Sequence, residues 1–119
     1  MGDMRLGAIE SRFADIIWAK EPITTAELIK ECAKELNWKR TTTYTVLKRL
    51  SDRGIFQNQD GTVTSLISRD EFYARQSEEF VEESFDGSLP AFLAAFTARR
   101  KLSKEEIKKI TDMIDSYEG

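Results

Sequence analysis

Basic and hydroxyl side chains are concentrated in one stretch of the sequence, residues 37–54. This stretch holds five basic residues and one acidic residue, a net charge of +4, whereas the whole chain of 119 residues has a net charge of −3. Lysine and arginine bind phosphates, and threonine and tyrosine hydroxyls can reach phosphates or base edges. The stretch therefore predicts a DNA-binding surface, although a solvated helix face is the plainer alternative. Its candidate contacts are Lys39, Arg40, Thr41, Thr42, Tyr44, Thr45, Lys48 and Arg49.

Several kinds of catalytic and metal chemistry lack the residues they need. The sequence contains no histidine and one cysteine, Cys32, and its six glycines are dispersed. Histidine-based triads, two-histidine zinc sites and glycine-rich phosphate loops are thereby excluded. We expect no enzyme, no metal site and no cofactor. Cys32 is expected to be a buried small apolar residue rather than a redox sensor.

No stretch of the sequence indicates a membrane or secreted protein. The longest apolar run, residues 91–96, is far too short to cross a bilayer, and the N-terminus has no signal-peptide pattern. A single cysteine fits a reducing compartment. We expect a cytoplasmic protein without direct membrane association.

The basic stretch follows two shorter helical patterns. Residues 8–20 have apolar side chains at helical spacing and stop at Glu21-Pro22. Thr24 and Glu27 form a capping-box pattern that begins a second helix, which runs to about Leu36. The basic helix then begins after a short turn and ends at Gly54. Two helices joined by a short turn, the second of them basic, predict a helix-turn-helix.

A hairpin pattern comes next. Two strand-like runs, residues 55–58 and 62–67, flank Gln59-Asp60-Gly61, and Asp-Gly between such runs is a good hairpin signal. A hairpin directly after a recognition helix is a wing, and Gln59 lies at its tip. The predicted fold is therefore mainly α with a small β-hairpin, with a winged helix-turn-helix DNA-binding domain in residues 1–68.

Residues 69–119 are expected to form a helical dimerisation region. Capping-box patterns at Ser68–Glu71 and Ser103–Glu106 and the break at 86–88 divide it into three short helices. These helices carry more apolar surface than they can bury alone, which favours a homodimer over a ligand pocket lined by the same aromatic rings. The candidate dimerisation residues are Phe72, Phe80, Phe92, Phe96, Ile107, Ile110 and Ile114.

Three segments together resemble the penicillinase-repressor family of winged-helix transcriptional regulators, which includes β-lactamase repressors and copper-responsive relatives. They are residues 10–18 (ESRFADIIW), 22–29 (PITTAELI) and 43–54 (TYTVLKRLSDRG). The resemblance implies a homodimeric repressor whose winged helix binds an inverted repeat in double-stranded DNA. It also implies that Thr41, Thr42 and Tyr44 approach bases, and that Arg49 supports the fold or a phosphate.

The resemblance has implications for derepression as well. In the β-lactamase branch, a membrane sensor metalloprotease sets off cleavage of an Asn-Phe bond in the C-terminal region. The matching position here is Ala95-Phe96, which keeps the phenylalanine but not the asparagine. The Cys-x-Cys pairs of the copper-responsive members are missing. Derepression by loss of the dimer is the favoured mechanism; direct ligand binding, or a protein-interaction role without DNA, are the alternatives.

Overall fold

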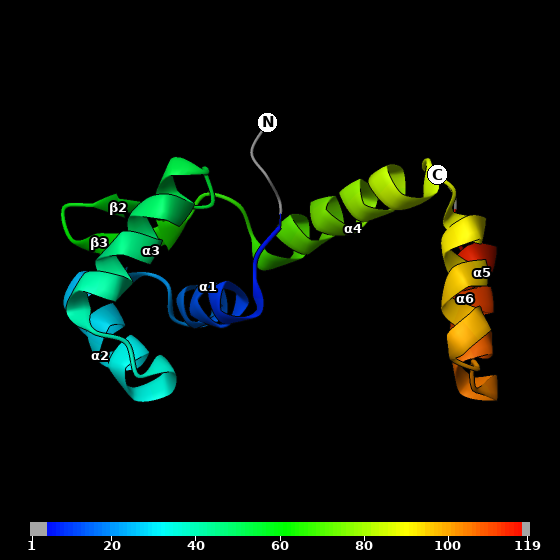
Figure 1. The fold of residues 1–119 in the computed structure, drawn as a ribbon, viewed down its shortest axis with the longest axis horizontal. Helices are drawn as coiled ribbons and strands as arrows, with labels where there is room; N and C mark the ends of the chain where they lie inside the picture. Colours follow the sequence, from blue (N-terminus) through cyan, green and yellow to red (C-terminus); the bar gives the residue numbers. More distant parts are fainter. Residues whose placement is uncertain (1–4, 118–119) are drawn as a thin grey trace. The chain divides into compact units, whose positions relative to one another are not determined.

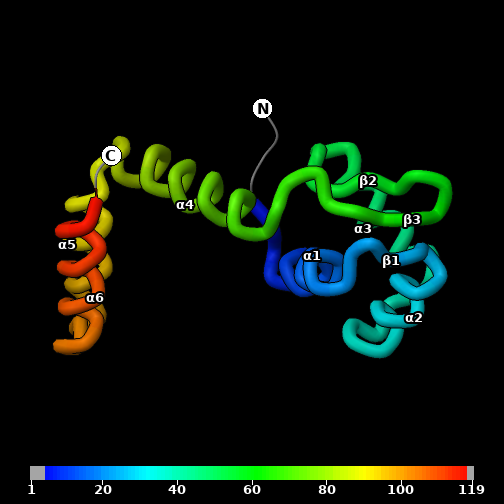
Figure 2. The backbone as a smooth tube through the Cα atoms, turned by 180° about the vertical axis from the view of Figure 1, so that it is seen from behind, coloured from blue at the N-terminus to red at the C-terminus, as the bar shows by residue number. Residues whose placement is uncertain are grey.

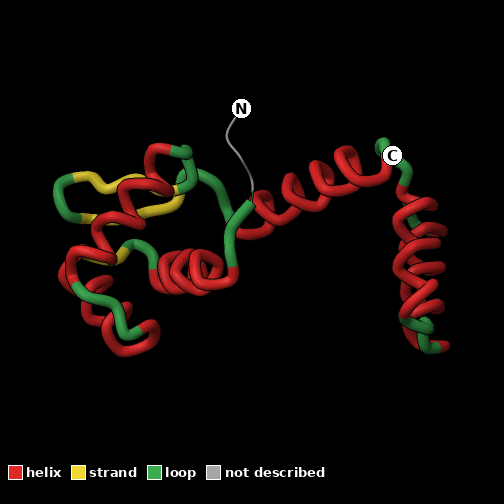
Figure 3. Tube along the Cα trace, viewed as in Figure 1, coloured by secondary structure: helices red, strands yellow, loops and turns green. Residues whose placement is uncertain are grey.

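The computed structural model describes residues 5–117, which form helices and short strands in two compact units divided between residues 79 and 80 (Figure 1). The predicted class, mainly helical with a small antiparallel sheet, is confirmed. Strands occur only in the first unit, and the described residues of the second unit are helical or in loops (Figure 3). The elements in chain order are α1 (Ala8–Lys20), β1 (Ile23–Thr24), α2 (Thr25–Leu36), α3 (Arg40–Asp52), β2 (Phe56–Gln59), β3 (Thr62–Ser65), α4 (Arg69–Phe85), α5 (Leu89–Arg99) and α6 (Lys104–Asp115).

The helix-turn-helix is built from local signals that the sequence contains. α1 ends at Lys20, because its C-cap residue Glu21 precedes proline and is extended. Thr24 caps α2 by accepting a hydrogen bond from the Glu27 backbone N–H at 3.1 Å. The Glu27 carboxylate accepts from the Thr24 hydroxyl at 3.3 Å, so the side-chain pair replaces the reciprocal backbone bond expected of a full capping box. The N-cap predicted at Thr24 is confirmed.

α3 ends in a Schellman motif. Gly54 donates to the Ser51 carbonyl at 3.0 Å, and Ile55 donates to the Leu50 carbonyl at 3.1 Å. This arrangement places the residue after the cap in the left-handed region, and Gly54 has a φ of 80°. The helix end predicted at Gly54 is confirmed.

The sheet has the strand order β1-β3-β2, with both pairs antiparallel. β2 and β3 are joined through Asp60 and Gly61, both at positive φ (51° and 86°), as a two-residue type I′ turn requires. The predicted hairpin is confirmed. The extended residues before α2 add a third strand, in which Ile23 pairs with Val63. Figure 2 shows β1, β3 and β2 in this unit.

One apolar core holds the first unit together. Its members come from α1, α2, α3, the sheet, the residue before β2 and the first turn of α4: Phe13, Ala14, Ile17, Ile23, Leu28, Cys32, Val46, Leu47, Leu50, Ile55, Phe56, Val63 and Phe72. Cys32 is fully buried, as predicted. Leu28 and Cys32 face this core from α2, which leaves the opposite side of that helix exposed.

Phe72 is a correction to the predicted dimerisation surface. Its side chain is 0% exposed and its ring centroid lies 5.5 Å from that of Trp18, inside the first unit. The Trp18 indole N–H donates to the Ile67 carbonyl at 3.0 Å, which fixes the chain just before α4 begins. A fully buried ring cannot contact a second chain, so Phe72 stabilises the winged helix instead.

The second unit begins with the last turns of α4. Phe80, Phe85 and Phe92 form a triangle of ring contacts, with centroids 5.8–6.1 Å apart. Ser88 caps α5, and Ser103 and Glu106 form the predicted capping box at the start of α6. α6 runs in the direction opposite to α5 (Figure 2). None of the residues described in this unit is buried, and its apolar side chains are half-buried or exposed.

Candidate nucleic-acid interface

α3 has one packed face and one exposed face, and its buried residues recur at helical spacing. Its buried side chains are Thr43, Val46, Leu47 and Leu50. Every α3 residue predicted to touch DNA, together with Lys39 at the N-cap, lies on the exposed side: Lys39, Arg40, Thr41, Thr42, Tyr44, Thr45, Lys48 and Arg49. This separation arises because apolar residues three and four positions apart share one face of a helix.

The threonine run at the start of α3 is divided between the two faces. Thr43 is 1% exposed, and its hydroxyl donates to the Lys39 carbonyl at 3.2 Å. Burial raises the pKa of the Cys32 thiol to about 11, outweighing the lowering effect of the neighbouring Thr43 hydroxyl. Thr41 and Thr42 remain exposed, so their hydroxyls face solvent beside the helix N-terminus. The Thr45 hydroxyl donates back to the Thr41 carbonyl at 2.8 Å, which leaves its lone pairs as acceptors.

Arg40 and Tyr44 form a stacked pair on the exposed face. The Arg40 guanidinium carbon lies 5.6 Å from the centroid of the Tyr44 ring, within cation–π range. This contact restricts the arginine to one side of the helix. Within residues 5–117, neither Lys39 nor Arg40 forms an ion pair, so both charges are available for an anionic partner.

Lys48 and Arg49 are already paired with carboxylates. Lys48 bonds Asp52 one turn along the helix at 3.1 Å. The Arg49 Nη1 atom lies 2.9 Å from Oε2 of Glu10 on α1. Burial raises the pKa of Glu10, but hydrogen bonds from the Gly7 N–H and from Arg49 outweigh it and bring the pKa below its ordinary value. Glu10 carries no local signal for this pairing, since nothing in a sequence links two residues 39 positions apart.

The wing lies beside α3, because β2 packs against that helix (Figure 1). Gln59 and Thr62 are exposed at its tip. The other polar wing residues are engaged internally: Gln57 donates to the Thr64 hydroxyl at 3.1 Å, and Asn58 accepts from the Gly61 N–H at 3.0 Å. The turn carries one acidic residue, Asp60, and no basic one, so the positive charge of the candidate interface belongs to α3.

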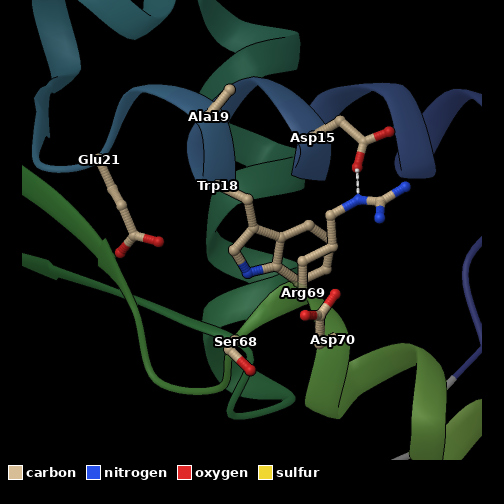
Figure 4. Close-up of a pocket in the computed structure, with 7 residues that line it drawn as sticks. All are labelled: Asp15, Trp18, Ala19, Glu21, Ser68, Arg69 and Asp70. Carbon is tan, nitrogen blue, oxygen red and sulfur yellow. Dashed lines mark hydrogen bonds and ion pairs between the residues drawn. The ribbon is translucent and has the colours of Figure 1, made fainter.

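A surface recess lies on another part of the first unit, where α1 meets the start of α4 (Figure 4). It has a volume of about 440 Å³ and is lined by Asp15, Trp18, Ala19, Glu21, Ser68, Arg69 and Asp70. Two of its carboxylates are satisfied internally. Arg69 donates to Asp15 at 3.0 Å, and Glu21 accepts two hydrogen bonds from Ser65 at 2.8 Å, one from the backbone N–H and one from the hydroxyl. The recess therefore lies where the Arg69–Asp15 ion pair connects the start of α4 to α1.

Residues 5–117 contain no cluster of three or more cysteine, aspartate or glutamate side chains placed to hold a metal ion. No helix described in the structure is long and apolar enough to cross a membrane.

A helix-turn-helix with a basic, exposed second helix and an adjoining β-hairpin defines the winged-helix class of DNA-binding proteins. The family model described as "Penicillinase repressor" matches residues 6–116, nearly the whole chain. The chain belongs to the penicillinase repressor family, whose members are transcriptional regulators, and the resemblance noted from the sequence is confirmed.

Individual relatives are similar over most of their length. The penicillinase repressor of Bacillus licheniformis is 28% identical over 108 residues, which cover 87% of this chain and 84% of the relative. The methicillin resistance regulatory protein MecI of Staphylococcus aureus is 23% identical over 114 residues, 92% of this chain and 93% of the relative. MecI of Mammaliicoccus sciuri is 22% identical with the same coverage.

Proposed function

We propose that this protein is a homodimeric transcriptional repressor, working in the cytoplasm, that binds an inverted-repeat operator in double-stranded DNA through α3 and the wing. The observation that carries the proposal is the exposed face of α3, where Lys39 and Arg40 lie beside Thr41, Thr42 and Tyr44 and have no carboxylate partner within the described part of the chain. A helix that presents two neighbouring free cations at its N-terminus is suited to a polyanion.

Each part of this face has a separate role in the proposal. Lys39 and Arg40 neutralise phosphates, and the adjacent N–H groups of the α3 N-terminus favour the same charge. Arg40, held over Tyr44, can alternatively reach the edge of a guanine. Thr41, Thr42 and Tyr44 supply hydrogen bonds and apolar contacts to base edges. Lys48 and Arg49 reach the backbone only by exchanging their carboxylate partners for phosphate, and Gln59 touches the backbone from the wing.

The second unit supplies the proposed dimer. Phe80 is 51% exposed, Ile107 50% and Ile114 66%, a degree of apolar exposure that a stable monomer rarely keeps. A second copy would bury these side chains, and its twofold symmetry matches an inverted repeat. The proposed dimer residues are Phe80, Phe92, Phe96, Ile107, Ile110 and Ile114.

Derepression follows, in this proposal, from loss of the dimer, because one winged helix alone buries too little surface for tight operator binding. Ala95 and Phe96 are both exposed in α5, and cutting the chain between them would remove α6 from the dimer. A membrane sensor metalloprotease is the proposed agent. The backbone there is helical, so the segment must open locally before a protease can bind it.

The test is fluorescence anisotropy of a labelled fragment from the region upstream of the gene, titrated with protein at several salt concentrations. We expect the affinity to fall by roughly a hundredfold between about 50 and 200 mM salt, since a dimer with two free cations a chain neutralises about four phosphates. Scrambled DNA should bind far more weakly.

Two variants with the same change in net charge distinguish loss of a DNA contact from a general effect of charge. Lys39→Glu/Arg40→Glu should abolish specific binding, whereas Lys30→Glu/Lys34→Glu, on the exposed side of α2, should weaken it only slightly. Equal losses in the two variants, or binding indifferent to DNA sequence, would contradict the proposed interface.

A further inference from the structure

The charges of the second unit are separated along the sequence. Residues 80–98 contain three acidic residues and no basic one, and residues 99–104 contain four basic residues and no acidic one. All seven side chains are exposed: Glu82, Glu83, Asp86, Arg99, Arg100, Lys101 and Lys104. Among the residues that the structure describes, Arg99, Lys101 and Lys104 form no ion pair, and Arg100 is 3.8 Å from Glu106.

The fold of this unit converts the separation along the sequence into a separation in space. The acidic residues precede the start of α5, and the basic residues follow its end. α5 has 11 residues, so its two ends are about 16 Å apart. α6 returns toward the start of α5, and its last turns add Asp112 and Asp115 at that end (Figure 2). The unit therefore has an acidic end, residues 82–86 with Asp112 and Asp115, and a basic end, residues 99–104. Glu105 and Glu106 begin α6 beside the four cations, so residues 99–106 have a net charge of +2, and Asp112 at the acidic end is paired with Lys108.

Exposed apolar side chains lie along the two helices that join these ends. Phe96 on α5 is 38% exposed, and Ile107 and Ile114 on α6 are 50% and 66% exposed. An apolar centre with a charged rim is the usual composition of a protein–protein interface. The charges at the rim then decide which orientation of the partner is favoured.

We propose that two copies of this chain associate with their α5–α6 hairpins antiparallel, so that the acidic end of each copy lies against the basic end of the other. The inference rests on the proposed function for the existence of a homodimer, and it adds the orientation and its electrostatic cause. A twofold axis that crosses the hairpins places each end opposite its complement, so one kind of contact occurs twice. A parallel arrangement would place two basic ends, each with a net charge of +2 over residues 99–106, against each other, and likewise the two acidic ends.

This arrangement makes self-association depend on salt in a defined direction. Opposite charges at a solvent-exposed rim attract less when they are screened, so the dimer should weaken as salt increases. Like charges in a parallel arrangement would give the opposite result, because salt would relieve their repulsion. The sign of the salt effect therefore distinguishes the two orientations.

Sedimentation equilibrium of the full chain without DNA tests the proposal, at about 50 and 500 mM sodium chloride. Three variants are compared with the wild type. The first reverses the acidic end (Glu82→Lys/Glu83→Lys), the second reverses the basic end (Arg99→Glu/Lys101→Glu), and the third carries all four substitutions. Lys30→Glu/Lys34→Glu, on α2 in the first unit, is the control for the charge change of the second variant.

We expect the dimer Kd of the first two variants to rise by roughly one to two orders of magnitude at low salt, because each creates like-charge contacts twice in the dimer. The fourfold variant should recover most of the wild-type affinity, since its ends are again complementary. An equimolar mixture of the first two variants should form heterodimers for the same reason. The control should keep the wild-type Kd.

Three results would overturn the proposal. One is a wild-type dimer that strengthens with salt, and another is a fourfold variant as weak as the two double variants. The third is wild-type affinity in all variants, which would leave the dimer of the proposed function intact but remove its charge pairing. A wild-type chain that stays monomeric at every salt concentration would instead contradict the proposed homodimer itself.

Discussion

Arg49 of α3 donates a hydrogen bond from Nη1 to Oε2 of Glu10 on α1 at 2.9 Å. The pair lies at the solvent boundary, with Arg49 54% and Glu10 22% exposed. It connects the helix that carries the candidate DNA-binding face to the first helix of the fold. The two cations at the start of α3, Lys39 and Arg40, have no such anchor in the described residues. The basic residues of α3 therefore divide into an anchored group and a free group.

The first prediction concerns this division. Arg49→Ala should lower the free energy of unfolding by at most about 1 kcal/mol, as expected for a partly exposed ion pair, and should weaken operator binding by less than about fivefold. Arg40→Ala should leave unfolding almost unchanged but weaken binding by roughly tenfold or more, because it removes a free charge at the helix N-terminus. Urea unfolding and anisotropy measure the two effects. If Arg49→Ala abolished binding without any loss of stability, Arg49 would be a DNA contact rather than an anchor.

The second prediction concerns pH. The pKa of Glu10 is lowered in the folded state, so the ionised carboxylate stabilises the fold at pH values above its ordinary value, and this stabilisation is lost as the pH falls through the folded-state pKa. Glu10→Gln should therefore be less stable than the wild type near pH 7, by at most about 1 kcal/mol. The difference should shrink at pH values below 4.5, the ordinary pKa of the group. Urea unfolding of both proteins across this range is the measurement. A difference that is constant with pH would show that the charge of Glu10 is not involved.

The third prediction separates Phe72 from the exposed apolar residues of the second unit. Phe72→Ala should destabilise the winged helix by about 3–5 kcal/mol, because it opens a cavity in the core. Ile114→Asp, at a side chain 66% exposed, should leave the winged helix folded but should raise the dimer Kd. Thermal unfolding and sedimentation distinguish these outcomes. A folded Phe72→Ala protein that has merely become monomeric would return Phe72 to the dimer surface.

The fourth prediction concerns the wing. Asp60 is the acidic residue of the turn, and in the proposed complex it lies near phosphates. Asp60→Asn removes the charge but keeps the φ of 51°, since asparagine also tolerates the left-handed region. Operator affinity should rise by roughly two- to threefold at low salt, and the gain should disappear at high salt. Unchanged affinity at every salt concentration would place the wing tip away from the DNA backbone. Circular dichroism checks that the hairpin is retained.

Most of the local structure could be predicted from the sequence. The stop of α1 before Pro22, the cap at Thr24, the turn at Asp60-Gly61 and the end of α3 at Gly54 each follow from the conformational preference of one or two residues. The assignment of α3 side chains to two faces follows from its helical period. These signals act within a few residues, so a single sequence contains them completely.

The tertiary structure decided what depends on contacts distant in sequence. It paired Arg49 with Glu10, added Ile23 to the sheet opposite Val63, and buried Phe72 beside Trp18. An aromatic residue at the start of a helix carries the same local signal whether it enters its own core or faces a second chain. Only the packing of α4 against α1 distinguishes these two cases. The sequence by itself therefore determined the elements and the exposed basic face of α3, whereas the fold determined which charges are free and which aromatic side chains remain exposed.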